Sequence, residues 1–436
     1  MPDPLRIGLA GLGTVGVGVI RLLDTNRDLL AARAGRPIEL VAVSARDRHR
    51  ERGIDLSPYG WEDDMAALAQ RDDVDVVVEL VGGSDGPALT LARAALGAGK
   101  PLVTANKAMI AHHGLALAEL AEARDVALKF EAAVAGGIPV VKGLREGTSA
   151  NKLERIYGIL NGTCNYILST MEDTGADFAE VLGEAQAKGY AEADPTFDIE
   201  GIDAAHKLAI LAAIGFGARI DFDAVRTTGI TRVQAADIAQ ADTLGYVIRL
   251  IAMTDVEPDE SGAPRLLQRV RPCLVPKSHP LASVDGPTNA VVAEGNFSGR
   301  LLFQGAGAGE GPTASAVVAD LIDIARDEVG APFSIPVASL AKMAPAEPGH
   351  RMERTYLRFT VADRPGVLAE IAAAMRDAGV SIESLIQKAR SDDGGDVLVA
   401  MVTHEGPERC VTQALALLEG SDSLTAQPLV LPILPD

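Results

Sequence analysis

Two lysines and an aspartate stand in positions that suit acid–base chemistry. Lys107 directly follows a strand-like segment that should be buried, whereas most lysines in the chain are solvated surface charges. Asp203 and Lys207 are four residues apart on a predicted helix, so they share one of its faces. This helix continues as the apolar run 208–214, which indicates that the pair lies in a cleft; an ordinary surface ion pair is the alternative. Carboxylates beside a lysine can bind an ammonium group while the lysine moves a proton.

Two more carboxylates, Glu192 and Asp198, precede this helix in the run 189–198, Gly-Tyr-Ala-Glu-Ala-Asp-Pro-Thr-Phe-Asp. We expect them near the same cleft. Cys164 lies in another short polar run, Asn161–Asn165, where a packed thiol is the preferred interpretation over a nucleophile.

A glycine-rich turn near the N-terminus predicts a dinucleotide site. The run Gly11-Leu12-Gly13-Thr14-Val15-Gly16 follows a predicted strand and opens a predicted helix. In such a turn the first glycine permits the tight bend, the second lets the backbone approach a pyrophosphate, and the third lets helix and strand pack closely. The phosphate then lies at the positive end of the helix. A purely structural turn is the alternative, but it does not explain three glycines at these offsets.

The tip of the second predicted strand indicates which dinucleotide binds. NAD sites usually carry an acidic residue there, for the ribose 2′-hydroxyl. Here the tip is Ser44 with Arg46 close behind, so a 2′-phosphate is favoured and we expect NADP. Asp47 leaves NAD possible.

The elements that position these residues alternate over residues 1–145. Strand-like runs occur at 6–10, 38–43, 74–80, 101–104 and 127–131, with helical runs at 88–96 and 115–123. Such alternation predicts an α/β domain of the Rossmann type, with helices on both faces of a parallel sheet.

The rest of the chain predicts two further domains. Residues 146–305 read as an α+β domain, with strand-like runs at 153–160, 266–275 and 289–304 and helical runs at 180–188 and 202–214. The Pro-, Ala- and Gly-rich stretch within 344–353 predicts a linker. Strands at 355–361, 397–403 and 427–434 and helices at 367–378 and 407–418 then predict a ferredoxin-like βαββαβ module over 354–434.

Composition excludes several classes of protein. The 436 residues carry a net charge of −20, which argues against a nucleic-acid binder. No apolar run approaches the roughly 20 residues of a membrane span. The three cysteines, Cys164, Cys273 and Cys410, lack the spacing of a disulfide framework or a zinc site. We therefore expect a cytoplasmic protein that binds neither nucleic acid nor membrane.

Six motifs, in order, make the chain similar to homoserine dehydrogenases. They are the glycine-rich turn 11–16, Thr-Ala-Asn-Lys at 104–107, Glu-Ala-Ala-Val-Ala-Gly-Gly-Ile-Pro at 131–139, Asn-Gly-Thr-Cys-Asn at 161–165, Gly-Tyr-Ala-Glu-Ala-Asp-Pro at 189–195, and Asp198 with Asp203 and Lys207. The segment 359–369, Phe-Thr-Val-Ala-Asp-Arg-Pro-Gly-Val-Leu-Ala, resembles an ACT domain. We see no resemblance to an aspartate kinase, so we expect the monofunctional form with a regulatory tail.

The resemblance implies NAD(P)-linked interconversion of L-aspartate 4-semialdehyde and L-homoserine, in threonine, methionine and isoleucine biosynthesis. Lys207 would donate a proton to the aldehyde oxygen as hydride arrives, and Lys107 would help bind cofactor and substrate and polarise the carbonyl. Glu192 and Asp203 would hold the substrate's ammonium group, and Asp198 would shape the site. The residues alone leave open which lysine carries the proton.

Two glycine-containing segments also have implied roles. The resemblance implies a sodium ion held by the backbone carbonyls of Glu131, Val134, Gly136 and Ile138, although a loop that simply joins two domains is the alternative. The stretch 305–311 resembles the return of the chain into the Rossmann domain, which residues 306–343 would complete. There Gly309 would approach the cofactor, whereas Glu310 would repel phosphate.

The tail suggests regulation by an amino acid. The turn Asp363-Arg-Pro-Gly366-Val367 joins a strand to a helix, and its backbone amides could meet a ligand carboxylate. ACT modules commonly pair edge to edge, so the resemblance implies effector sites at the seam between chains, with L-threonine as the expected effector. It also implies a homodimer or homotetramer. A tail used only for oligomerisation is the alternative.

Two other functions fit parts of the pattern. An aspartate-semialdehyde dehydrogenase would need a catalytic cysteine and a histidine base, and no cysteine here lies in such a setting. An amino-acid sensor on an inactive Rossmann scaffold is the second, and the joint presence of Lys107, Glu192, Asp203 and Lys207 argues against it.

Overall fold

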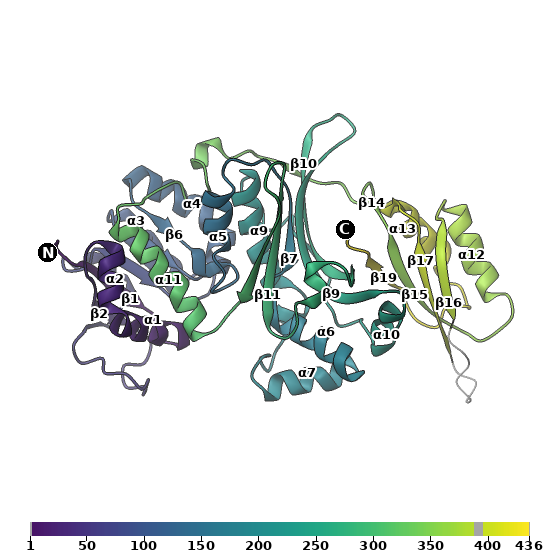
Figure 1. Ribbon diagram of the computed structural model, residues 1–436, viewed down its shortest axis with the longest axis horizontal. Coiled ribbons are helices and arrows are strands. Elements are labelled where there is room, and N and C mark those ends of the chain that lie inside the picture. The colour runs from purple at the N-terminus through teal and green to yellow at the C-terminus, as the bar shows by residue number, and fades with distance from the viewer. Residues whose placement is uncertain (1, 388–395, 436) are drawn as a thin grey trace.

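The computed structural model describes residues 2–387 and 396–435, which form three units in a row (Figure 1). The N-terminal unit is built on a six-stranded sheet in the order β3-β2-β1-β4-β5-β6, and all neighbouring strands run parallel. The strands are β1 Leu5–Ala10, β2 Ile38–Ser44, β3 Gly60–Glu62, β4 Val76–Glu79, β5 Leu102–Thr104 and β6 Leu128–Lys129. This order places a dinucleotide past the carboxyl ends of β1 and β4, so the predicted Rossmann class is confirmed.

The helices of this unit come from two distant parts of the chain. They are α1 Thr14–Thr25, α2 Arg27–Ala34, η1 Met65–Gln70, α3 Pro87–Gly97, α4 Lys107–Arg124 and α11 Glu310–Ala325. Figure 1 shows α11, drawn in green, among the purple and blue elements of the N-terminus. Val317 and Leu321 of α11 share one apolar core with Leu9 and Val19. α11 begins at Glu310, directly after Gly309, which takes a positive φ of 124°.

A mainly antiparallel seven-stranded sheet forms the centre of the molecule. Its order is β12-β11-β7-β9-β10-β13, with β8 also paired to β10. The strands are β7 Leu153–Ile159, β8 Arg226–Thr227, β9 Tyr246–Pro258, β10 Pro264–Pro276, β11 Thr288–Gly295, β12 Gly299–Ala306 and β13 Ala344–Pro345. The helical elements are η2 Glu131–Ala133, α5 Val140–Lys142, η3 Gly143–Gly147, α6 Gly162–Thr174, α7 Phe178–Ala187, α8 Thr196–Ile199, α9 Ile202–Phe216, α10 Ala235–Thr243, η4 Pro280–Ser283 and η5 Val337–Ser339.

The C-terminal unit has the predicted βαββαβ order. Its sheet runs β16-β17-β15-β19, all antiparallel. The elements are β14 Met352–Glu353, β15 Thr355–Val361, α12 Val367–Asp377, β16 Ile382–Gln387, β17 Val397–Thr403, β18 Gly406–Pro407, α13 Glu408–Leu417 and β19 Leu429–Pro432. Helices α12 and α13 pack on one face, and the other face meets α10 (Figure 1). There Tyr356 and Arg358 both bond the buried carboxylate of Asp237.

The segment predicted as a linker is held at both ends. β13 pairs with β10, and β14 pairs with β18. The last residues of the chain also return to the central sheet, because the amide of Leu434 donates to the carbonyl of Leu274 in β10. The C-terminal unit is therefore docked on the central sheet. Within the described ranges 2–387 and 396–435, no helix combines the length and apolar character needed to cross a bilayer.

Candidate functional site

A cleft of about 970 Å³ separates the N-terminal unit from the central unit. Its walls come from the start of α1, the start of α4, the loop after β6, the starts of α6 and α9, and the end of β12. The residues that matter for chemistry are Val15, Lys107, Gly136, Asn161, Asp198, Asp203, Lys207 and Gly309. The structure therefore gathers candidates that are spread over almost 300 positions of the sequence.

One carboxylate joins the two lysines. Asp203 Oδ1 lies 3.0 Å from Lys107 Nζ, and Asp203 Oδ2 lies 2.7 Å from Lys207 Nζ. Lys107 comes from the first position of α4 and the other two from α9, so the contact bridges the two sides of the cleft. The alternative of a plain surface ion pair is wrong, because Asp203 and Lys207 are both buried.

Burial and charge set the protonation of this group. Burial alone would raise the pKa of Asp203, but the two neighbouring lysines hold it well below its ordinary value. Burial also lowers the pKa of Lys207, with Asp203 opposing that shift and Lys107 reinforcing it. Lys207 Nζ donates to Asp203 and, over 2.7 Å, to the carbonyl of Leu160. An ammonium has three N–H bonds, so within the described residues one is left for a ligand in the cleft.

Asn161 is a site residue that the sequence reasoning did not single out. Its Nδ2 donates to Asp198 Oδ1 at 2.7 Å and to Asp203 Oδ2 at 2.9 Å. Its Oδ1 accepts from the amide of Cys164, so Asn161 also caps the N-terminus of α6. Its sequence signals were its place in the motif 161–165 and its position directly before a helix. Burial raises the pKa of Asp198, which also accepts from the Thr163 hydroxyl.

The thiol near this network is packed. Cys164 Sγ donates to the backbone carbonyl of Asp198, and burial raises the pKa of the thiol well above its ordinary value. A thiol held neutral in this way is a poor nucleophile, in agreement with the sequence interpretation.

The three glycines of the N-terminal turn have three different surroundings. A Cβ on Gly11 would lie 2.5 Å from the carbonyl oxygen of Leu80, and one on Gly16 would lie 2.0 Å from that of Gly11. A Cβ on Gly13 would meet no other atom of the described residues within 4 Å, so the space beside its backbone is open. These are the packing and approach conditions of a pyrophosphate site.

Arginines follow β2, where the ribose of a dinucleotide would lie. Arg46 is exposed just past Ser44, the last residue of β2. Arg52, which the sequence reasoning missed, donates to the carbonyl of Leu12 and to that of Asp47. It thereby ties the segment after β2 to the glycine-rich turn.

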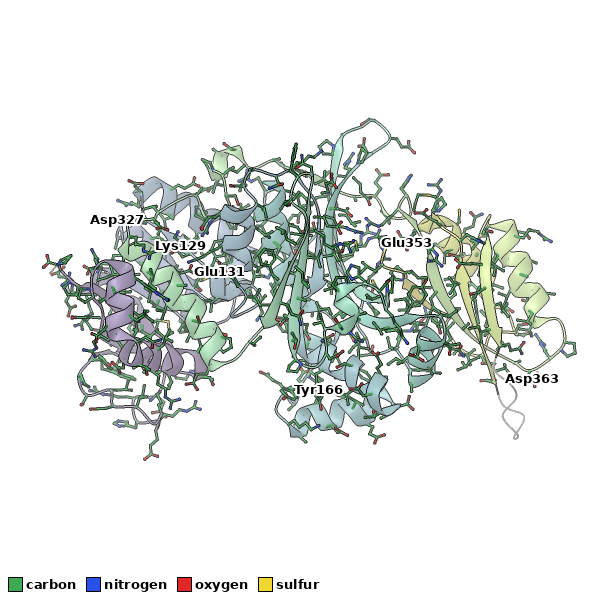
Figure 2. All side chains as sticks on the ribbon, in the orientation of Figure 1. Lys129, Glu131, Tyr166, Asp327, Glu353 and Asp363 are labelled. Atoms are coloured by element: carbon green, nitrogen blue, oxygen red, sulfur yellow. The ribbon has the colours of Figure 1, made fainter. Side chains whose placement is uncertain are left out.

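The loop 131–139 is buried and tightly bent. Glu131, Val134 and Ile138 are buried, and Gly136 lines the cleft. Ala135 has a positive φ of 56°, which is uncommon for a residue with a side chain. Figure 2 shows Lys129 and Glu131 where the N-terminal unit adjoins the central one.

The side chain of Glu131 braces this loop. Its carboxylate accepts from the amides of Val141 and Lys142, and its own amide donates to Asp320 of α11. Burial, with the charge of Asp320, raises the pKa of Glu131 to about 7.

Glu192 is the one expected substrate ligand that the structure does not bring to the cleft. It is exposed in the loop between α7 and α8, where its carbonyl accepts from Gln186. Gly189 and Tyr190 of the same loop do line the cleft. Gly309 lines it too, and Glu310 pairs with Arg21 at 2.7 Å, which offsets its negative charge.

The turn in the C-terminal unit forms its own hollow of about 360 Å³. Asp363, Gly366 and Val367 line it, together with Gln387 and Val399. Gly366 has a positive φ of 100° at the N-terminus of α12. Figure 2 shows Asp363 at the end of the molecule remote from the N-terminal unit.

Comparison with known proteins agrees with this geometry. Family models match over residues 11–131 (homoserine dehydrogenase, NAD binding domain), 139–322 (homoserine dehydrogenase) and 355–416 (ACT domain). A homoserine dehydrogenase of Pseudomonas aeruginosa is 44% identical over 97% of both chains, and one of Corynebacterium glutamicum is 43% identical over 96% of this chain and 93% of its own.

Solved structures agree as well. A homoserine dehydrogenase of Thiobacillus denitrificans superposes with a TM-score of 0.92 at 40% identity, covering 99% of this chain and 98% of its own. One of S. aureus, solved at pH 7.5, gives a TM-score of 0.75 at 32% identity over the whole of both chains. The chain thus belongs to the homoserine dehydrogenase family of NAD(P)-dependent oxidoreductases, and it carries an ACT domain.

Proposed function

We propose that the cleft interconverts L-aspartate 4-semialdehyde and L-homoserine, with Lys207 as the proton donor to the aldehyde oxygen. The observation that carries this assignment is the shared carboxylate of Asp203, which holds both lysines beside the dinucleotide turn. A nicotinamide cofactor bound there supplies the hydride. The reaction is placed in threonine, methionine and isoleucine biosynthesis, in the cytoplasm.

Lys207 is suited to move a proton because its surroundings fix its position. Two of its N–H bonds go to Asp203 and Leu160, so the third has a defined direction. Its pKa is lowered by burial, which eases proton release to a developing alkoxide. Lys107, with its side chain about one-third exposed, is free enough at the cleft to polarise the carbonyl and to meet the cofactor.

The three carboxylates Asp203, Glu192 and Asp198 are assigned different roles. Both oxygens of Asp203 are already bonded to protein groups, so we assign it to positioning the lysines and not to holding the substrate's ammonium. Glu192 is assigned to that ammonium, with a movement of its loop toward the cleft. Asp198, fixed by Asn161 and Thr163, shapes the site between them.

NADP is the proposed cofactor, with NAD as the alternative. Arg46 is assigned to the 2′-phosphate, because it is the first cation after the tip of β2 and its side chain is exposed. Residues 11–16 and Gly309 are assigned to the pyrophosphate of the cofactor. In such a site the backbone comes close to the pyrophosphate, and the absence of a side chain at Gly13 leaves room for this contact.

A sodium ion is proposed at the loop 131–139, on the carbonyls of Glu131, Val134, Gly136 and Ile138. The fit rests on the bend: Ala135 and Gly136 are consecutive left-handed residues, and such a turn aims neighbouring carbonyls to one side. Carbonyl oxygens are hard donors that suit a hard cation. The ion would fix the loop that carries one wall of the cleft.

Domain boundaries follow the same assignment. We propose a Rossmann domain over 1–145 completed by 306–343, a catalytic and dimerisation domain over 146–305, a connecting segment at 344–353 and an ACT domain over 354–434. The homodimer or homotetramer is part of this proposal.

L-threonine is the proposed effector, bound in the hollow of Asp363, Gly366 and Val367. Deletion of the ACT domain would uncover α10 and β10, so a point variant is the cleaner test. Gly366→Asp should weaken inhibition by threonine, because its carboxylate would repel that of the ligand. Gly379→Asp, at another positive-φ glycine outside the hollow, is the matched control. Equal sensitivity of the Gly366 variant and the wild type would place the effector site elsewhere.

The activity itself is tested by following NADP⁺ reduction with L-homoserine. We expect reduction that depends on both substrates. The same assay with L-aspartate 4-semialdehyde, phosphate and NADP⁺ reports the rival aldehyde-oxidising reaction. Turnover only in the second assay would refute the proposal.

A further inference from the structure

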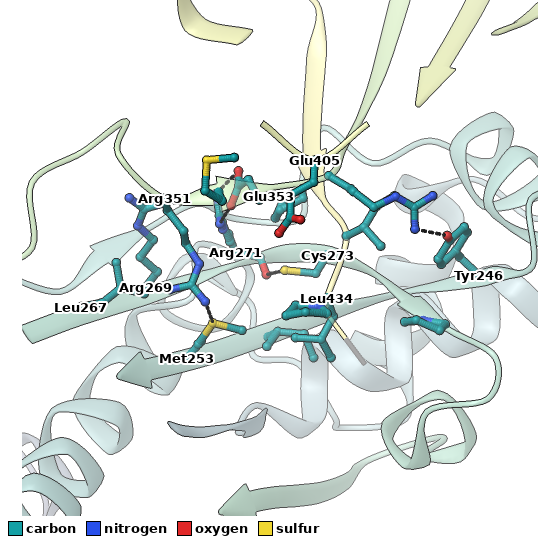
Figure 3. A pocket seen from close by; sticks show the side chains of 17 residues that line it. Tyr246, Met253, Leu267, Arg269, Arg271, Cys273, Arg351, Glu353, Glu405 and Leu434 are labelled. Carbon is teal, nitrogen blue, oxygen red and sulfur yellow. Dashed lines mark hydrogen bonds and ion pairs between the residues drawn. The ribbon is translucent and has the colours of Figure 1, made fainter. Parts of the chain in front are cut away.

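A second pocket, of about 290 Å³, lies between the central sheet and the ACT domain (Figure 3). It shares no lining residue with the cleft. Its walls come mainly from β9, β10, the segment 351–354 and residues 432–435. The lining residues used below are Ile251, Met253, Leu267, Cys273, Arg351, Glu405 and Leu434.

One guanidinium in this cavity has an arm without an oxygen partner. Arg351 Nη1 donates to Asp255 at 2.8 Å and also to Glu257. Its Nη2 donates only to Met253 Sδ at 3.4 Å, and a thioether is a weak acceptor. Figure 3 shows this contact within the cavity. The side chain is 14% exposed, and the pocket adjoins it.

The other arginines of the wall are differently placed. Both Nη atoms of Arg269 bond Glu408 at 3.0 Å, and Arg271 pairs with Glu353 at 2.6 Å. Arg354 bonds the carboxylate of Glu383 and the hydroxyl of Tyr246. Among the described residues that line the pocket, Arg351 is therefore the arginine whose second arm has no oxygen acceptor.

The carboxylate of Glu405 provides a negative charge at the same pocket. Glu405 lines the cavity and has no hydrogen bond or ion pair with any residue in the described part of the chain. Figure 3 shows its carboxylate among the side chains that surround the cavity. Beside the paired arginines, the wall also carries four apolar side chains, Ile251, Leu267, Cys273 and Leu434.

We propose that this cavity binds a free L-α-amino acid with a short aliphatic side chain. Its carboxylate bonds the second arm of Arg351, its ammonium pairs with Glu405, and its side chain packs against the apolar wall. A charge of each sign beside an apolar surface is the pattern that such a zwitterion complements. The site is separate from the hollow at Gly366, which no residue of this cavity shares.

Ligand binding in this pocket can affect the active site through the central sheet. Met253 is paired across the sheet with Tyr157 of β7. That strand leads to Leu160, whose carbonyl holds Lys207. A ligand that reorders the Arg351–Met253 contact therefore acts on the strand next to the one that fixes the catalytic lysine.

Titration calorimetry on the full-length protein tests the proposal without reference to turnover. The probes are L-isoleucine, L-valine, L-methionine and L-threonine, together with isocaproate, which lacks the ammonium, and isoamylamine, which lacks the carboxylate. We expect saturable binding of the aliphatic amino acids and at least tenfold weaker binding of the two single-charge probes, since each loses a charge-assisted hydrogen bond.

Two mild variants locate the binding. Arg351→Lys keeps a cation for Asp255 and Glu257 but removes the second arm, and Glu405→Gln keeps the shape of an exposed side chain. Each should weaken binding by roughly ten- to a hundredfold. Arg265→Lys, on the same strand β10 but outside the cavity, and Glu347→Gln are the matched controls and should bind as the wild type does.

Three results would overturn the proposal. One is the absence of saturable binding for every aliphatic amino acid at the solubility limit. Another is unchanged affinity in both cavity variants. The third is loss of the same binding in Gly366→Asp, because that would assign it to the ACT hollow.

Discussion

Replacement of Lys207 by alanine is the sharpest test of the catalytic assignment. The change removes the buried ammonium and three methylene groups, and it leaves that space empty next to Asp203 and Leu160. A positioned general acid contributes about 10²- to 10⁴-fold to the rate. At about 1.4 kcal/mol per decade, the barrier should rise by about 3–5.5 kcal/mol.

The fold should survive this change, although at some cost. Breaking a buried ion pair typically costs about 3–5 kcal/mol, since a charge is left without a partner. Asp203 here keeps Lys107 at 3.0 Å and Asn161 at 2.9 Å, so the loss should fall below that range. Thermal unfolding of the variant measures this term separately from catalysis.

The assay is the initial rate of NADP⁺ reduction at saturating L-homoserine, with cofactor affinity measured by fluorescence titration. We expect kcat to fall by about 10²- to 10⁴-fold and cofactor affinity to stay within about threefold. Because the alanine leaves a space, methylammonium should restore part of the rate. Lys188→Ala removes an exposed lysine paired with Glu184 and is the control.

A folded Lys207→Ala variant that keeps kcat within about threefold would refute the assignment. If Lys107→Ala instead shows the large loss in kcat together with rescue by methylammonium, Lys107 is the proton donor.

Three further predictions address the rest of the chain. Arg46→Ala should weaken NADP⁺ by about one to two decades and leave NAD⁺ nearly unchanged in binding titrations, and equal losses would show that Arg46 only supports the fold. Glu192→Gln should raise the KM for homoserine with little effect on NADP⁺, which steady-state kinetics at varied homoserine would reveal; an unchanged KM would remove Glu192 from the substrate site. Burial lowers the pKa of His206 to about 4, so the neutral ring contributes stability that is present above pH 6.5 and is lost as the pH falls toward 4. Between pH 7.5 and pH 5 the wild type should therefore lose about 2 kcal/mol more unfolding free energy than His206→Gln in urea titrations, and parallel losses would contradict the pKa shift.

Local sequence patterns predicted most of the helices and strands that carry the site. They did not predict strands in which buried charged residues interrupt the apolar pattern. β1, α9 and α12 were predicted within a few residues, because their apolar periodicity is plain. β9 was not predicted, since Arg249 and Asp255 interrupt its apolar run; both are buried in ion pairs with distant residues. β16 was also missed, although the βαββαβ order requires it, because half-buried and exposed residues alternate there without a strongly apolar face.

The site shows a similar division. Spacing on one helix was enough to place Asp203 beside Lys207. Nothing local indicated that Asn161 donates to two carboxylates or that Arg52 bonds the glycine-rich turn, because both contacts join segments about 40 residues apart. The exposed position of Glu192 was also invisible in the sequence, since a motif fixes neighbours along the chain and not the conformation of a loop.

The charge of the reaction centre explains why its parts come from two units. Lys107 and Lys207 are held by the two oxygens of one carboxylate, so two ammonium groups lie together at the cleft in a chain whose net charge is −20. Such charge stabilises an alkoxide as it develops, provided that it is fixed beforehand. The pair Lys107–Asp203 crosses the cleft, so the arrangement is complete only when the N-terminal and central units are held together. The carboxylate that fixes Lys207 therefore also joins the two units across the cleft.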